Sequence, residues 1–115
     1  MPVQFQVIIK KNPMELSNTG ATLFAERAGH AIERKGFFTV ALSGGSTPRG
    51  MHRRLAEEPL RSSISWDQTH IFWVDERCVP VEDSASNYGA ACKDFIDRVP
   101  INKTNLHPMP VHMAP

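Results

Sequence analysis

The 115-residue chain is short of cysteine, of long apolar runs and of excess charge of either sign. Cys78 and Cys92 are too few and too irregular for a disulfide framework or a zinc site, so we expect reduced thiols. The five histidines include no pair at helical metal-site spacing, and we expect no metal and no cofactor. Apolar runs such as residues 71–74 are far shorter than the roughly 18 residues of a membrane helix.

The charge balance and the amino-terminal sequence argue against further classes of protein. Thirteen basic and 12 acidic residues give a formal net charge of +1 without a block of one sign, which argues against nucleic-acid and membrane partners. The amino terminus lacks the features of a signal peptide, so a cytoplasmic location is the default expectation. A hydrophobic fraction of 41% and this length predict one globular domain over residues 1–115.

Apolar periodicity predicts alternating strands and helices in the first third of the chain. Residues 3–9 alternate and then become continuously apolar, as in a strand. Asn12 is a suitable helix N-cap before Pro13, and the pattern that follows ends at the basic Lys35 and Gly36. Residues 37–42 are β-branched and aromatic, as in a strand buried on both faces.

The same alternation continues to about residue 107. A helix is predicted from Pro48 to about Pro59, a strand over 69–74, a helix capped by Ser86 and a short strand near Leu106. We therefore predict an α/β fold with an open, Rossmann-like parallel sheet and helices on both faces. Ligands of such sheets bind beyond the carboxyl ends of the strands.

A glycine-rich turn follows the second predicted strand at that end. Gly44 and Gly45 permit close approach of a ligand, and Thr47 or Ser46 is the expected N-cap of a helix with Pro48 in its first position. Helix N-termini bind phosphate, although a turn without a ligand is the simpler alternative. The turn matches neither nucleotide-binding glycine motif. The candidate phosphate-binding residues are Ser43, Gly44, Gly45, Ser46, Thr47 and Arg49. Replacing Gly45 by valine is expected to weaken binding more than stability.

The sequence Asp-Glu-Arg at 75–77 follows the next strand. Asp75 could act on a proton or hold a hydroxyl group, and Arg77 could pair with an anion. A solvated strand end with a local ion pair is the alternative. Asn87 comes soon after and could reach the same crevice.

Other polar residues are predicted to be structural. We expect His52 and His70 to lie at the surface or in packing contacts, and Arg53, Arg54 and Arg61 to form a solvated helix face.

Taken in order, "ALSGGSTP", Trp66, "FWVDERCVP" and "DSASNYG" resemble the 6-phosphogluconolactonase family. The resemblance implies hydrolysis of 6-phosphoglucono-lactone in the pentose phosphate pathway, and a fold related to glucosamine-6-phosphate deaminase. It implies that Gly44–Thr47 contact the substrate near its phosphate and that Asp75 and Arg77 stand at the active-site rim. Asn87 matches the family's Ser-Asn position after them, and we count it among the expected substrate-binding residues.

The sequence departs from this family in one respect. The family's proposed catalytic histidine lies in a Gly-x-Asp-Gly-His stretch, which His107 and His112 do not match. The resemblance therefore covers the family's amino-terminal half, and we expect a lactonase fragment that is incomplete at its carboxyl-terminal side and inactive alone. We also expect self-association through the open sheet edge. A non-catalytic sugar-phosphate-binding module and a deaminase or isomerase remain alternatives, although that group typically has tyrosine where Arg77 stands.

Overall fold

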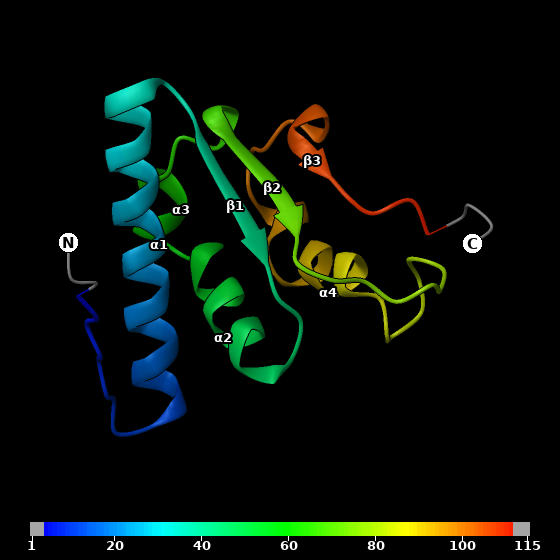
Figure 1. Cartoon of the computed structure of the whole chain (residues 1–115), viewed down its shortest axis with the longest axis horizontal. Coiled ribbons are helices and arrows are strands. Elements are labelled where there is room, and N and C mark those ends of the chain that lie inside the picture. The colour runs from blue at the N-terminus through cyan, green and yellow to red at the C-terminus, as the bar shows by residue number, and fades with distance from the viewer. Residues whose placement is uncertain (1–3, 112–115) are drawn as a thin grey trace.

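A computed structural model describes residues 4–111 of the chain. The strands form one three-stranded sheet in the order β1-β2-β3 (Figure 1). The strands β1 (Phe38–Leu42) and β2 (Thr69–Trp73) pair in parallel along their whole length, and β2 pairs in parallel with β3 (Leu106–His107). The parallel α/β sheet predicted from the alternation of elements is confirmed.

Helix α1 (Pro13–Lys35) has the predicted bounds because both of its end signals are local. The Asn12 side chain accepts a hydrogen bond from the Glu15 backbone N–H at 2.9 Å. Gly36 ends the helix in the left-handed conformation, with φ 83°. Glycine adopts this conformation without the steric cost that a Cβ atom imposes.

The segment after β1 forms two helices where one was predicted. Helix α2 covers Ser46–Leu55 and the short α3 covers Leu60–Ser63. Helix α4 (Asn87–Asp94) begins after its predicted cap, Ser86, and ends before a 3₁₀ turn at Ile96–Arg98.

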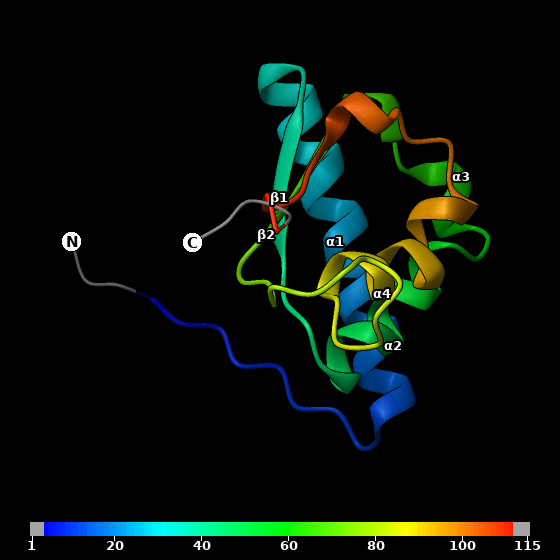
Figure 2. The ribbon, with the colours of Figure 1, turned by 90° about the vertical axis from the view of Figure 1, so that its right-hand side faces the viewer.

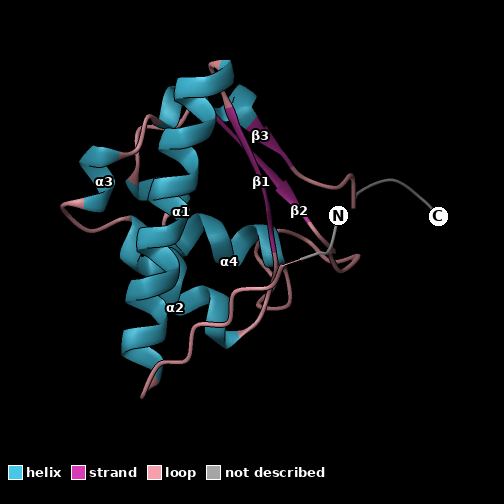
Figure 3. Cartoon of the chain, turned by 60° about the vertical axis from the view of Figure 1, so that its left-hand side comes forward, coloured by secondary structure: helices cyan, strands magenta, loops and turns pink. Residues whose placement is uncertain are grey.

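Within residues 4–111 the helices cover one face of the sheet (Figure 2). Figure 3 shows the strands at one side of the helical layer. On the covered face Leu42, Ile71 and Trp73 are buried, whereas Ala41 and Phe72 of the opposite face are exposed. The second helical layer that we predicted is absent from the described part of the chain.

The predicted strand at residues 3–9 is wrong for its described residues. Residues 4–10 have no strand partner, and Phe5 and Ile9 are 86% and 87% exposed. Figure 2 shows this segment leaving the start of α1 on the side of the sheet that carries no helix. A strand requires a hydrogen-bonding neighbour, which alternation along the sequence cannot supply. Val3 lies outside the described residues.

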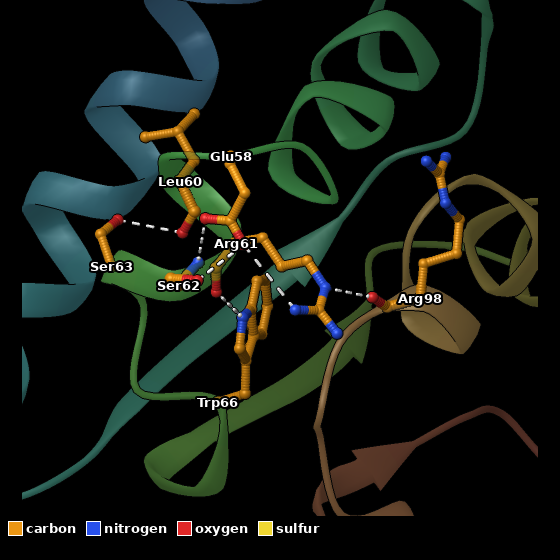
Figure 4. A network of polar contacts seen from close by, with 7 residues as sticks. All are labelled: Glu58, Leu60, Arg61, Ser62, Ser63, Trp66 and Arg98. Atoms are coloured by element: carbon orange, nitrogen blue, oxygen red, sulfur yellow. Dashed lines mark hydrogen bonds and ion pairs between the residues drawn. The ribbon is translucent and has the colours of Figure 1, made fainter.

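The core lies between the sheet and the helices. The Trp66 ring, 2% exposed, packs against Phe24 and Phe95 with centroid distances of 6.3 and 5.9 Å. Its indole N–H donates to the Arg61 carbonyl oxygen at 2.9 Å, and the Arg61 Nε donates to the Arg98 carbonyl oxygen at 2.8 Å (Figure 4). These bonds fasten α3 to the turn after α4. None of the helices in residues 4–111 has the length and apolar character needed to cross a membrane.

Candidate anion-binding site

The turn between β1 and α2 leaves the start of α2 without a side-chain cap. Gly45 is the N-cap residue, with φ 108° and ψ 167°, a region of backbone space that is nearly exclusive to glycine. The helix therefore begins at Ser46, and the prediction of Thr47 or Ser46 as N-cap with Pro48 in first position was wrong. No side chain accepts from the first-turn N–H groups. Such a helix start carries about half a positive charge and suits an anion.

Asn87, the first residue of α4, packs directly against this turn. A Cβ atom placed on Gly44 would overlap the Asn87 side-chain amide, so only glycine fits at position 44 without displacing it. The Asn87 Nδ2 donates to the Asp75 carbonyl oxygen at 3.1 Å. The strand ends of β1 and β2 are thus joined through one amide side chain.

Glu76 holds the start of α4. Its carboxylate accepts hydrogen bonds from the backbone N–H groups of Asn87 and Tyr88 at 2.7 and 2.8 Å, and from that of Arg77 at 2.9 Å. Burial acts to raise the pKa of Glu76, but these N–H groups outweigh it and hold the pKa below its ordinary value. Ser86 Oγ accepts from the Gly89 N–H at 3.0 Å. The N–H groups of the first three residues of α4 therefore have side-chain acceptors, whereas those of Ser46 and Thr47 in α2 have none and Pro48 has no N–H group.

A pocket of about 330 Å³ lies between the glycine turn, α2, the end of β2 and α4. Three arginines line it: Arg49 and Arg53 from α2, and Arg77 from the loop after β2. The Arg77 Nη1 donates to the Ala85 carbonyl oxygen at 2.9 Å, which ties this side chain to the loop before α4. The pocket combines three cations with an uncapped helix start.

Asp94 lies behind two of these arginines. Its carboxylate accepts from the Arg49 Nε at 2.8 Å and Nη2 at 3.1 Å, and lies 3.4 Å from the Arg53 Nε. The hydrogen bond from Arg49 to Asp94, and the attraction between the two charges, raise the pKa of Arg49.

His52 also lines the pocket, but its ring belongs to the core. The side chain is 3% exposed and packs on Phe95 with a centroid distance of 5.3 Å. Burial lowers the pKa of His52 to about 4, Asp94 opposes this shift and Arg49 adds to it. The imidazole is neutral at pH 7, and the predicted packing role is confirmed.

Most of the predicted site residues meet in this pocket. Its lining includes Ser43, Gly44, Gly45, Ser46, Arg49, Arg77 and Asn87. Thr47 lies outside it and lines an apolar groove between α1 and α2. The exposed Asp75 is also absent from the lining and reaches the site through its backbone carbonyl, bonded to Asn87.

Sequence reasoning missed Arg53, which was assigned to a solvated face, and Asp94. Arg49 and Arg53 are spaced i, i+4 on one helix, a signal that both side chains share a face. No signal in the sequence pairs Asp94 with them, because the contact joins residues 45 positions apart. Among the described residues no group of three or more His, Cys, Asp or Glu side chains is placed to hold a metal ion.

The profile of the family described as glucosamine-6-phosphate isomerases/6-phosphogluconolactonase matches residues 11–115. The chain belongs to this family. It is 38% identical over 111 residues to probable 6-phosphogluconolactonase 5 of Arabidopsis thaliana, covering 96% of this chain and 44% of that protein. It is 37% identical over 109 residues to the 6-phosphogluconolactonase of Synechocystis, covering 95% and 44%.

Solved structures agree with this assignment. The 6-phosphogluconolactonase of Trypanosoma cruzi superposes with a TM-score of 0.82 and 28% identity, over 97% of this chain and 41% of that one. A monomeric glucosamine-6-phosphate deaminase shares the fold, with a TM-score of 0.76 at 20% identity. The chain spans less than half the length of these relatives. Some rice relatives are described as chloroplastic, and the cytoplasmic location of this chain stays a prediction.

Proposed function

We propose that this chain forms the phosphate-binding half of a 6-phosphogluconolactonase site. The observation that carries the proposal is the uncapped start of α2 facing a pocket lined by Arg49, Arg53 and Arg77. A sugar phosphate presents an anion with three acceptor oxygens, which free backbone N–H groups and guanidinium groups match in charge and geometry. The family relationship supplies the lactone as the substrate to test.

Arg77 and Asp75 are the proposed catalytic residues. Ester hydrolysis requires activation of the attacking water and stabilisation of the developing oxyanion. Arg77 lines the pocket and is placed to stabilise an anion. Asp75 follows β2 at the rim, with its exposed side chain outside the pocket lining, so its proposed role depends on rotation of that side chain toward a bound sugar.

Calorimetric titration tests the phosphate site directly. We expect the chain to bind 6-phosphogluconate and not gluconate, which has the same sugar acid without the phosphate. Arg77→Gln should weaken binding by roughly tenfold or more, because a charge-assisted hydrogen bond contributes about 1.5–3 kcal/mol. Arg34→Gln, which removes an exposed cation from α1, is the matched control. Equal binding of the two sugar acids would refute the phosphate site.

A non-catalytic sugar-phosphate-binding module is the second candidate. It is favoured by the position of Asp75 outside the pocket and by the burial of His52, which leave the described pocket without an accessible general base. Binding of 6-phosphogluconate without lactone turnover would support this function. Release of ammonia from glucosamine 6-phosphate would instead support the deaminase activity found in the wider family.

A further inference from the structure

We propose that Asp94 is a positioning residue of the anion site: it fixes the guanidinium groups of Arg49 and Arg53 so that they face the pocket. The inference rests on the proposed function, since it assigns a role within the same site. Asp94 is not itself part of the pocket lining and acts through the two arginines, which are.

The placement of Asp94 is unfavourable by itself. The side chain is 4% exposed, so its carboxylate has lost most of its hydration. It is also the last residue of α4, where the partial negative charge of the helix end repels an anion. A buried carboxylate at this position needs cationic partners, and Arg49 and Arg53 are the ones that contact it.

The contacts leave donors of both arginines available. Arg49 gives its Nε and one N–H of Nη2 to Asp94, and its side chain remains 39% exposed. Arg53 directs its Nε to the same carboxylate and remains 55% exposed. A guanidinium group has five N–H donors, so each retains donors for a ligand while the Asp94 contact restricts its rotamers. Preorganisation of this kind reduces the entropy lost on binding.

Two effects of Asp94 on an anion oppose each other. Its negative charge lowers the positive potential of the pocket, and removal of that charge would favour binding. Its hydrogen bonds to Arg49 and its ion pair with Arg53 hold two long side chains, and without them the ligand would have to order each side chain on binding, which weakens affinity. An Asp94→Asn variant should therefore bind the anion more weakly if the positioning of the arginines dominates, and more tightly if the negative charge of Asp94 dominates.

The experiment is a mutant cycle read by calorimetry with 6-phosphogluconate and with inorganic phosphate. Asp94→Asn is placed in the wild-type chain and in an Arg49→Gln/Arg53→Gln background. We expect a roughly tenfold loss of affinity in the wild-type chain and little change in the double-mutant background. A structural role would reduce affinity equally in both. Glu57→Gln, which removes the exposed partner of Arg54, is the matched control and should leave affinity unchanged.

A second measurement needs no substitution. In ¹H–¹⁵N spectra of the wild-type chain, the Arg49 Nε–H should exchange slowly with water and shift when phosphate is added, unlike that of the exposed Arg34. Slow exchange and a phosphate-dependent shift support the proposal even if Asp94→Asn does not fold.

Three results would overturn the positioning role: affinity of Asp94→Asn equal to or above wild type, equal losses in both backgrounds, or an Arg49 Nε–H that behaves like that of Arg34. In each case the wild-type chain would still bind 6-phosphogluconate and the proposed function would stand. Absence of binding by the wild-type chain would overturn both.

Discussion

Gly45 and Gly36 both have positive φ angles and would accept a Cβ atom without a clash, but only Gly45 borders the pocket. Replacing either glycine by alanine should lower the free energy of unfolding by about 1–3 kcal/mol, because alanine is strained in these backbone conformations. This strain also means that the valine substitution considered from the sequence would lower stability as well as binding. Alanine is the smaller perturbation.

We predict that Gly45→Ala weakens 6-phosphogluconate binding, because its strain shifts the first turn of α2, whereas Gly36→Ala does not. Denaturant titration gives the stability of each variant, and calorimetry gives the affinity. The prediction fails if the two substitutions change the affinity by the same factor.

His52 predicts a pH dependence of stability. Its native pKa of about 4 lies below the ordinary value of 6.5, so protonation favours the unfolded chain. Its contribution to stability is complete above pH 6.5 and is lost as pH falls toward 4. Between pH 7 and pH 5 the loss should be about 2 kcal/mol.

Urea denaturation of His52→Leu and of the exposed His30→Gln at these two pH values checks the assignment. The leucine variant should lose much of the pH dependence, and His30→Gln should retain it. If the unfolding free energies of the two variants fell equally between pH 7 and pH 5, groups other than His52 would be responsible for the pH dependence.

Individual residues of the site were predictable where the signal was local. Gly44, Gly45 and Arg77 could be identified because they lie within a few residues of strand ends, at the edge of the sheet where ligands bind. Asp94 could not, because its partners are in another helix. The packing of Gly44 on Asn87 likewise became visible only in three dimensions.

Helices α2 and α4 both start near the pocket, but they differ in the hydrogen-bond acceptors available to their first backbone N–H groups. Glu76 and Ser86 occupy those of α4, whereas no side chain caps α2. This contrast supports the proposed anion site at α2. It also gives Glu76, to which the sequence assigned no role, a structural one.

We predict that Glu76→Gln lowers stability by about 1–2 kcal/mol, because an amide accepts these N–H groups less strongly than a carboxylate does. It should also weaken ligand binding, because Asn87 and Arg77 are held through Glu76. The contribution of Glu76 is complete above the ordinary carboxyl pKa of 4.5 and is lost as pH falls through the lower native pKa. Thermal melts at pH 7 measure the loss, with the exposed Glu82→Gln as control. Equal melting temperatures for Glu76→Gln and Glu82→Gln would contradict the predicted loss of stability.

At the scale of elements, local end signals predicted α1 well, and continuous apolar runs predicted β1 and β2. The start of α2 was misplaced because Gly45 has a backbone conformation that composition does not specify. The segment at residues 4–9 was misassigned because alternation indicates strand propensity and not the presence of a pairing neighbour.

For the whole molecule, we predict that the chain 1–115 does not accelerate hydrolysis of 6-phosphoglucono-lactone appreciably. A well-placed general base contributes about 10²–10⁴-fold, and the described pocket has no accessible one. Turnover is measured against the spontaneous rate, with a longer family member as positive control. Rates equal to that control would refute the prediction.

The uncovered sheet face predicts self-association. Phe72 and Val74 are 42% and 59% exposed, and β1 has an unpaired edge in the described chain. Sedimentation velocity should show mass increasing with concentration, and Phe72→Ser should reduce the effect more than Met14→Ser on α1. A monomer at all concentrations would contradict the prediction.

The contact between Gly44 and Asn87 links ligand binding to complete folding. The pocket needs the β1–α2 turn and the start of α4 to meet, although 43 positions separate these two residues in the sequence. A ligand that recognises only this assembled arrangement raises the unfolding free energy by RT ln(1 + [L]/Kd), which is about 2.7 kcal/mol at a hundredfold excess over Kd. A sugar phosphate that binds as proposed would therefore stabilise the folded chain, and raising its concentration should increase the fraction that survives proteolysis.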